Sequence, residues 1–166
     1  ADALAFANNS NINATLSLVA DNGITQNAGA SITTTAVTGK TGLVNISMTA
    51  NGNYQGNTAA SANSKGITLN AGITTNGSIT LTGNNQSGAT DGAGAGVYIN
   101  RQTIDAGTSD VAITGTATDG SGTFINGAST IRGRNVTIGG TSNTSASNKS
   151  GTGVYLYRDN TTTIAA

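Results

Sequence analysis

The sequence predicts an all-β protein: a right-handed parallel β-helix with about three short strands in each turn. Three observations lead to this prediction. Aliphatic residues alternate with polar ones in short segments, these segments recur in a fixed order, and turn-forming residues separate them. Recurrence at roughly 25 to 35 residues is typical of a solenoid whose turns stack on one another. The right hand follows from the general preference of parallel crossover connections.

The first strand of each repeat has an aliphatic residue on either side of a small or polar one. Aligning the copies places Val44-Asn45-Ile46 beside residues 79–81, 111–113 and 136–138. Alternation with period two puts the aliphatic residues on one side of the strand, which we expect to face the interior. The outward column of this alignment is Asn45, Thr80, Ala112 and Thr137.

The second strand follows a glycine, and the third is a short step that ends in isoleucine. The second-strand copies are residues 66–69, 96–99, 122–125 and 153–156. The third-strand copies carry Ile73, Ile104, Ile131 and Ile164. Asn-Gly and Asp-Gly pairs supply tight turns between strands. Polar stretches near 49–66, 82–96, 115–123 and 139–153 all fall between the first and second strands, so we expect loops at one corner of the coil.

Composition fits one repetitive domain spanning residues 1–166. Of the residues 36% are apolar and only 8% are charged, and the net charge is zero. A neutral chain has no long-range attraction for nucleic acid, and no apolar run reaches the roughly 20 residues that span a bilayer. We therefore expect no nucleic-acid partner and no membrane insertion. Neither end carries a polar cap, which suggests a segment of a longer fibre.

Catalytic and metal sites are not predicted. The chain has no His and no Glu, and the nearby carboxylates Asp105 and Asp110 lack an evident basic partner for lyase or hydrolase chemistry. The glycine-rich loops at Asp91 and Asp119 offer one carboxylate each, whereas calcium takes six to eight oxygen ligands. We expect no enzyme activity, no metal and no cofactor. Asp105 aligns with Arg132 one turn away and is predicted to pair with it.

The candidate binding residues form an aromatic column on the second strand. Tyr98, Phe124 and Tyr155 follow the aligned glycines by two positions and are expected to stack on the outer face. The rings of this candidate glycan-contact face are flanked by Asn100, Arg101 and Asn126, with Tyr157 and Arg158 beside the last ring. Rings beside polar and charged groups suit a sugar, which presents CH patches and hydroxyls together. A purely structural aromatic stack is the alternative, and stacking energy alone favours it.

Several segments resemble a known family. The runs at residues 16–26, 29–33 and 42–46 resemble the repeats of filamentous-haemagglutinin-type exoproteins. The segments Gly-Ser-Ile-Thr-Leu at 77–81 and Gly-Ala-Gly-Val-Tyr-Ile at 94–99 resemble repeats of large biofilm adhesins of the same two-partner-secretion group. The resemblance implies an extracellular or cell-surface bacterial adhesin, exported through a partner pore in the outer membrane.

The favoured function is therefore a rod-like adhesin stalk that attaches cells to one another, to a matrix or to a host, with a polysaccharide as partner. One alternative is an ice-binding β-helix, suggested by the threonines of residues 31–35 and 161–163, although the outward columns of the alignment are mixed. The other is a polysaccharide-active enzyme or a phage tail-spike domain. We expect the enzyme to release sugar from a glycan and the tail spike to form a trimer.

Overall fold

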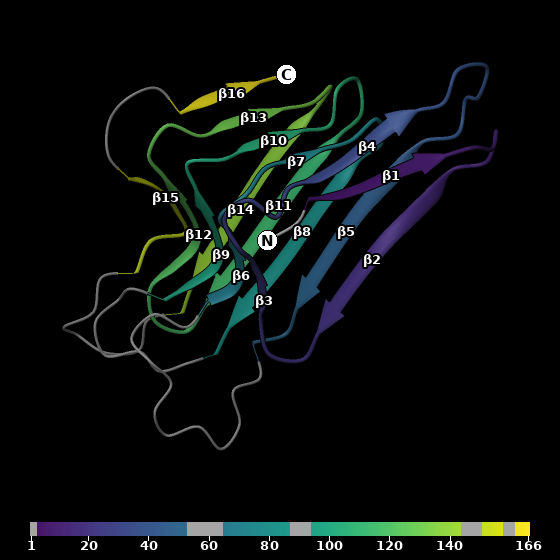
Figure 1. The fold of residues 1–166 in the computed structure, drawn as a ribbon. Helices are drawn as coiled ribbons and strands as arrows, with labels where there is room; N and C mark the ends of the chain where they lie inside the picture. The colour runs from purple at the N-terminus through teal and green to yellow at the C-terminus, as the bar shows by residue number, and fades with distance from the viewer. Residues whose placement is uncertain (1–2, 53–64, 87–93, 144–150, 158–161) are drawn as a thin grey trace.

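The computed structural model describes residues 3–52, 65–86, 94–143, 151–157 and 162–166. Within these ranges sixteen strands form three sheets, and no helix is present. Figure 1 shows the sheets as slanting stacks of strands that run beside one another. No described segment is therefore a candidate for a membrane-spanning helix.

The three sheets take their strands in rotation. Sheet A consists of β1 (Leu4–Asn8), β4 (Ile32–Ala36), β7 (Ile73–Thr74), β10 (Thr103–Asp105), β13 (Thr130–Arg132) and β16 (Thr163–Ala165). Sheet B consists of β2 (Ala14–Ala20), β5 (Val44–Ala50), β8 (Ile79–Asn85), β11 (Val111–Ala117) and β14 (Val136–Ser142). Sheet C consists of β3 (Ile24–Gln26), β6 (Lys65–Leu69), β9 (Ala95–Asn100), β12 (Ser121–Asn126) and β15 (Val154–Tyr157).

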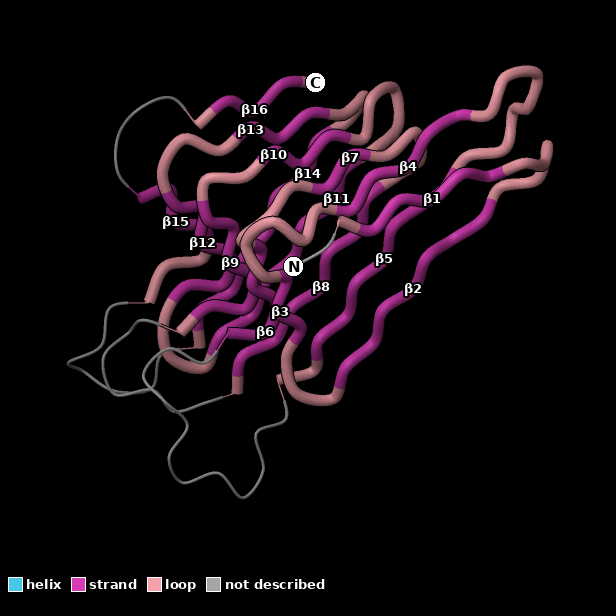
Figure 2. The backbone as a smooth tube through the Cα atoms, viewed as in Figure 1, coloured by secondary structure: helices cyan, strands magenta, loops and turns pink. Residues whose placement is uncertain are grey.

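Hydrogen-bonded neighbours within a sheet lie three strands apart in chain order, and all of these pairs are parallel. The chain therefore passes through sheets A, B and C in turn and then pairs with its own previous turn. In Figure 2 the pink segments of the tube are the described connections between strands. The fold is a parallel β-helix with three strands per turn, which confirms the predicted fold class.

Register within sheets A and C follows the predicted columns. Ile104 pairs with Ile73 and Ile131, and Ile131 pairs with Ile164. In sheet B the alignment is wrong at one step, because Ile79 pairs with Ile46 and not with Val44. Strand β5 has four inward positions, Val44, Ile46, Met48 and Ala50, and a shift of two residues keeps the same residues on the same face. Alternation therefore cannot distinguish the two registers.

The strands of sheet B are longer than the sequence suggests. The strands β8, β11 and β14 each run for seven residues and include 82–85, 115–117 and 139–142, which were expected to belong to loops. Asn85 illustrates the difference, since it is only 1% exposed and lies on the inner face. Much of the remaining predicted loop sequence lies outside the described residues. Polar and glycine residues extend these strands because the partner strand already fixes the register.

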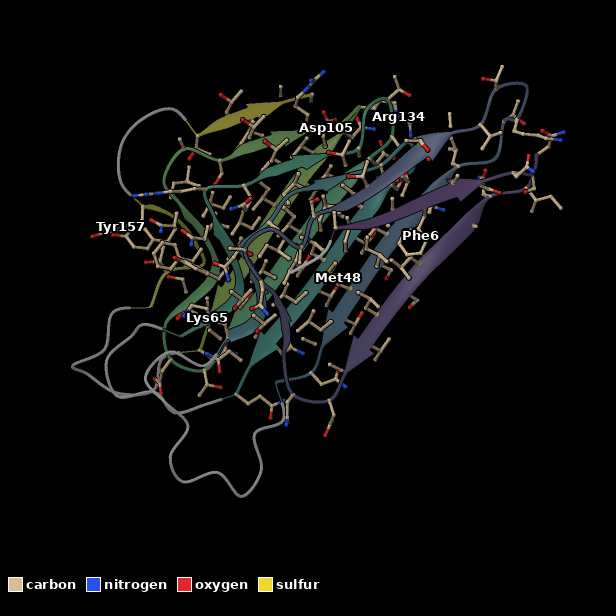
Figure 3. The ribbon with its side chains drawn as sticks, in the orientation of Figure 1. Phe6, Met48, Lys65, Asp105, Arg134 and Tyr157 are labelled. Carbon is tan, nitrogen blue, oxygen red and sulfur yellow. The ribbon has the colours of Figure 1, made fainter. Side chains whose placement is uncertain are left out.

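The interior is filled by aliphatic side chains from all three sheets. Met48 lies among them in Figure 3 and is 1% exposed. Twelve large side chains of the described residues are less than 2% exposed: Ile46, Met48, Ile67, Leu69, Ile73, Ile79, Leu81, Ile99, Ile104, Ile113, Ile125 and Ile131. Each contributes roughly 1.5 to 3 kcal/mol through removal from water. The core is thus a continuous column along the coil.

Glycines line the corner where sheet B meets sheet C. A Cβ at Gly115 would overlap the carbonyl oxygen of Gly122, and one at Gly83 would overlap the carbonyl oxygen of Gly96. Two backbones therefore approach each other here without side chains between them. This requirement explains the glycine at the second position of β6, β9 and β12, where an added Cβ would also meet backbone atoms. It also places the following residues of sheet C in the same position in every turn.

Candidate functional site

The outer face of sheet C carries the predicted aromatic column. In β9, Val97 and Ile99 are fully buried while Tyr98 between them faces outward. Phe124 pairs in register with Tyr98 on one side and with Tyr155 on the other. Thr68 continues the column one turn earlier. The structure therefore brings the three predicted rings together because inward aliphatic residues fix the faces of their strands.

The rings contact one another as a cluster. Phe124 lies with its ring centroid 5.2 Å from those of Tyr98 and Tyr155, and 5.7 Å from that of Tyr157. Tyr155 and Tyr157 are 5.6 Å apart. The planes of Tyr98 and Phe124 meet at 79°, so these two rings pack edge to face. Such packing indicates that Tyr98 and Phe124 stabilise the face. Tyr155, on the last strand of sheet C, is 39% exposed and is the most accessible of the four rings.

Asparagines form a second column beside the rings, at the C-terminal ends of the strands. The side-chain amide of Asn100 donates to Oδ1 of Asn70 at 3.0 Å. The amide of Asn126 donates to Oδ1 of Asn100 and to the hydroxyl of Tyr98, both at 3.0 Å. Tyr157 occupies the equivalent position in the next turn. We call Asn70, Asn100 and Asn126 the amide ladder.

Sequence reasoning named Asn100 and Asn126 only as neighbours of the rings and missed Asn70. The signal was present, because asparagine directly follows the last inward aliphatic residue in three copies: Leu69-Asn70, Ile99-Asn100 and Ile125-Asn126. Identical side chains at one register position stack at the strand spacing of about 4.8 Å and can hydrogen-bond in sequence. The amide ladder follows from that spacing.

Lys65 was also missed by sequence reasoning. It begins β6, and its Nζ lies 5.0 Å from the centroid of the Tyr98 ring. A lysine at this distance is attracted to the electron-rich face of the ring. One face of Tyr98 is therefore occupied by a cation, which further limits its availability to a ligand. Figure 3 shows Lys65 and Tyr157 on the same side of the molecule.

Arg101 lies at the corner that leads from sheet C to sheet A. It is exposed and has a φ of 56°, a left-handed conformation that no other described residue besides glycine adopts. Gly127 occupies the equivalent corner in the next turn, with a φ of 65°. A Cβ at Gly127 would lie 2.7 Å from Cγ of Arg101, so the arginine side chain extends across that glycine. Arg158, the last predicted site residue, lies outside the described residues.

Other charged pairs are at a different corner, next to sheets A and B. Asp105 and Arg132 lie 3.5 Å apart, which confirms the predicted pairing. Arg134 donates from Nε and Nη2 to the two oxygens of Asp110, at 3.0 and 2.8 Å, and Asn135 donates to Oδ1 at 2.9 Å. The hydrogen bond from Arg134, followed by that from Asn135, holds the pKa of Asp110 below its ordinary value. Asp105 and Asp110 thus each interact with an arginine.

The candidate site is built on the outer face of one sheet of the coil. One hollow of the described surface lies away from it, between sheets A and B, beside Thr34, Lys40 and Asn76. Among the residues with described positions, no three His, Cys, Asp or Glu side chains gather in a way that could hold a metal ion. The chemistry that sheet C offers is that of rings, amides and cations on an extended surface.

Comparisons of the chain with protein-family models, with curated proteins and with solved structures find no match.

Proposed function

We propose that this chain is part of the stalk of an extracellular bacterial adhesin, in which the β-helix is a stiff scaffold and sheet C contacts polysaccharide. The observation that supports this proposal most is the in-register stacking of rings and amides along successive turns of one face. A coil of parallel strands presents the same outward position every turn, so a face of this kind can contact a long polymer at many points.

Within the proposal, the individual contacts have different roles. Tyr98 packs against Phe124, accepts a hydrogen bond from Asn126 and lies under Lys65, so it mainly holds the face in place. Tyr155 and the neighbouring Tyr157, which pack on each other at the end of the ring column, present rings to the sugar. The remaining hydrogen-bonding capacity of the amide ladder suits sugar hydroxyls, since each side-chain amide has two N–H donors and an acceptor oxygen.

A role in binding is proposed in place of catalysis. The carboxylates of Asp105, at the end of β10, and of Asp110, just before β11, are each engaged by an arginine. Figure 3 shows Asp105 and Arg134 away from Tyr157 of the ring cluster. Glycosidase chemistry needs two carboxyl groups that face one substrate, one of them able to give up or take a proton. The export route through a partner pore, and the longer fibre to which this segment would belong, are parts of the same proposal and follow from the family resemblance.

The proposal can be tested by retention of coated beads. Beads that carry the chain are placed on immobilised bacterial exopolysaccharides under flow, and the bound fraction is measured. We expect the double variant Tyr155→Ser with Tyr157→Ser to lose most retention, while Thr80→Ala with Thr137→Ala on the outer face of sheet B retains it. Equal retention by both variants, with thermal unfolding showing both folded, would contradict a glycan-binding role for sheet C.

A second candidate function is supported by the corrected register of sheet B. One outward column contains Ser17, Ser47, Thr80, Ala112 and Thr137, and the next contains Val19, Thr49, Thr82, Thr114 and Gly139. Where neighbouring positions carry Ser or Thr, hydroxyls repeat at about 4.8 Å between strands and roughly 6.7 Å along a strand, a spacing that suits bound water, and Ala112, Val19 and Gly139 interrupt the array. This array is more regular than the sequence alignment suggested and is compatible with ice binding. A thermal-hysteresis assay tests it: activity lost in Thr82→Tyr would support ice binding, and no activity in the unmodified chain would exclude it.

A further inference from the structure

Arg101 differs from the other arginines whose positions are described. Arg132 pairs with Asp105, and Arg134 pairs with Asp110. Within the described ranges, Arg101 has no ion pair or side-chain hydrogen bond, and its side chain is exposed beside the amide ladder. Its charge is therefore not used to hold the fold together.

The backbone of Arg101 also argues against a purely structural role. Its φ of 56° is disfavoured for a residue with a Cβ, and glycine is the usual occupant of such a corner. The next turn meets the same need with Gly127. A large cationic residue at a position suited to glycine calls for a reason in its side chain, and such outliers cluster at ligand sites.

The side chain of Arg101 extends to the corresponding corner of the next turn. Its stem and Nε lie against Gly127, the residue that follows Asn126. The backbone N–H of Gly127 donates to the carbonyl of Tyr157 in the next turn, so this corner adjoins the exposed end of the cluster. The absence of a side chain at Gly127 leaves the space that Arg101 occupies.

The described charges on sheet C and at its corners toward sheet A have one sign, whereas Asp21 and Asp119 lie at the corners toward sheet B. Among the described residues of sheet C and of its corners toward sheet A, the charged side chains are Lys65 and Arg101, and both are positive. A positive face with rings and amides complements a polymer that carries negative groups on a sugar backbone. The guanidinium fork matches the two oxygens of a carboxylate in one plane.

We propose that Arg101 determines specificity for acidic polysaccharide by binding the carboxylate of a uronic-acid unit while the neighbouring rings and amides contact the sugar. This inference rests on the proposed glycan-binding function and specifies its ligand class. Lys65 adds to the positive potential but is held over Tyr98, so Arg101 provides the direct contact.

The experiment compares two forms of one polymer. Binding of the chain to polygalacturonate and to its fully methyl-esterified form is measured by biolayer interferometry at low and at moderate salt. The ester has the same backbone without the charge, so we expect binding weaker by about tenfold or more, as loss of a charge-assisted hydrogen bond predicts. Arg101→Gln and Arg101→Gly should both bind polygalacturonate as weakly as the unmodified chain binds the ester.

Two controls separate specificity from stability and from total charge. Arg101→Gly removes the charge but relieves the left-handed strain, so its thermal midpoint should equal or exceed that of the unmodified chain while its binding falls. Arg132→Gln removes the same charge from sheet A and should leave binding of the acidic polymer unchanged. Equal loss in Arg132→Gln, or full binding by Arg101→Gln, would overturn the assignment.

The result also distinguishes this inference from the function on which it rests. Equal binding of both polymers that depends on Tyr155 and Tyr157 would retain the glycan-binding face and refute the role of Arg101. Binding of neither polymer would refute the acidic ligand class. The bead assay on neutral exopolysaccharides would then test whether sheet C binds a glycan at all.

Discussion

Sheets B and C bury the same kind of side chain and expose different ones. On the inner side both have aliphatic columns, such as Ile46, Leu81 and Ile113 in sheet B and Ile99 and Ile125 in sheet C. On the outer side sheet B has small hydroxyl residues, while sheet C has rings, amides and cations. The inner columns are alike because both sheets pack against the same core. The outer columns do not have to fill a core, so we expect the side chains that differ between them to carry the function.

The largest effect should come from an inward residue of sheet B. Ile113→Ala leaves a cavity in the middle of the core, and we expect a loss of about 2 to 5 kcal/mol in the free energy of unfolding. Its neighbour Ala112 faces outward, so Ala112→Ser should change stability by less than about 0.5 kcal/mol. Urea denaturation of both variants measures the contrast. Similar losses in the two would contradict the assignment of faces.

The next effect tests the corner between the two sheets. Gly115→Ala places a methyl group against the carbonyl of Gly122, and we expect about 1 to 3 kcal/mol of destabilisation because neither backbone can move away easily. Gly139→Ala is the matched control, since the nearest atom that a Cβ there would meet, the carbonyl oxygen of Ile113, lies 3.9 Å away. A stable Gly115→Ala protein would show that the sheets lie further apart at this corner.

A smaller effect is expected from the amide ladder. Asn126→Ala removes hydrogen bonds to Asn100 and Tyr98, each of which contributes about 0.5 to 1.5 kcal/mol. Because the residue is only partly buried, we expect the lower end of that range. Thermal unfolding measures the loss, and Thr137→Ala on the outer face of sheet B serves as the comparison. Identical behaviour of the two variants would mean that the amide ladder does not stabilise sheet C.

The smallest effect concerns acid stability at the corner of Asp110. Because its pKa is lowered in the folded protein, the carboxylate stabilises the fold above the pKa of the unfolded chain, about 4, and this stabilisation is lost as the pH falls through the lower folded value. Arg134→Gln should therefore be slightly less stable than the unmodified chain at neutral pH and indistinguishable from it near pH 2. A difference that grows on acidification would contradict the cause assigned to the shift.

The sequence was sufficient to predict the coil, because the alternation of aliphatic residues and the aligned glycines follow directly from packing. It was also sufficient to place Tyr98, Phe124 and Tyr155 in one column. It could not choose between Val44 and Ile46 as the partner of Ile79, since both choices keep the same face inward. Strand ends in sheet B were missed because partner strands, and not local propensity, extend them.

Within the candidate site, the ring positions could be predicted but the roles of the rings could not. The edge-to-face packing of Tyr98, its contact with Lys65 and the conformation of Arg101 depend on side-chain directions and backbone angles that spacing does not encode. The pairing of Asp105 with Arg132 could be predicted from the sequence because it follows from strand register alone. The pairing of Asp110 with Arg134 links residues at a corner, where no regular register applies.

The most direct test of the central claim is to map where an acidic polysaccharide touches the protein. Backbone amide NMR spectra of the isotope-labelled chain are recorded while polygalacturonate oligomers are added. Our account predicts chemical-shift changes that cluster at Arg101, Asn126, Tyr155 and Tyr157 on sheet C, with the outward residues of sheet B unchanged. Changes centred on sheet B, or none on either face, would contradict it.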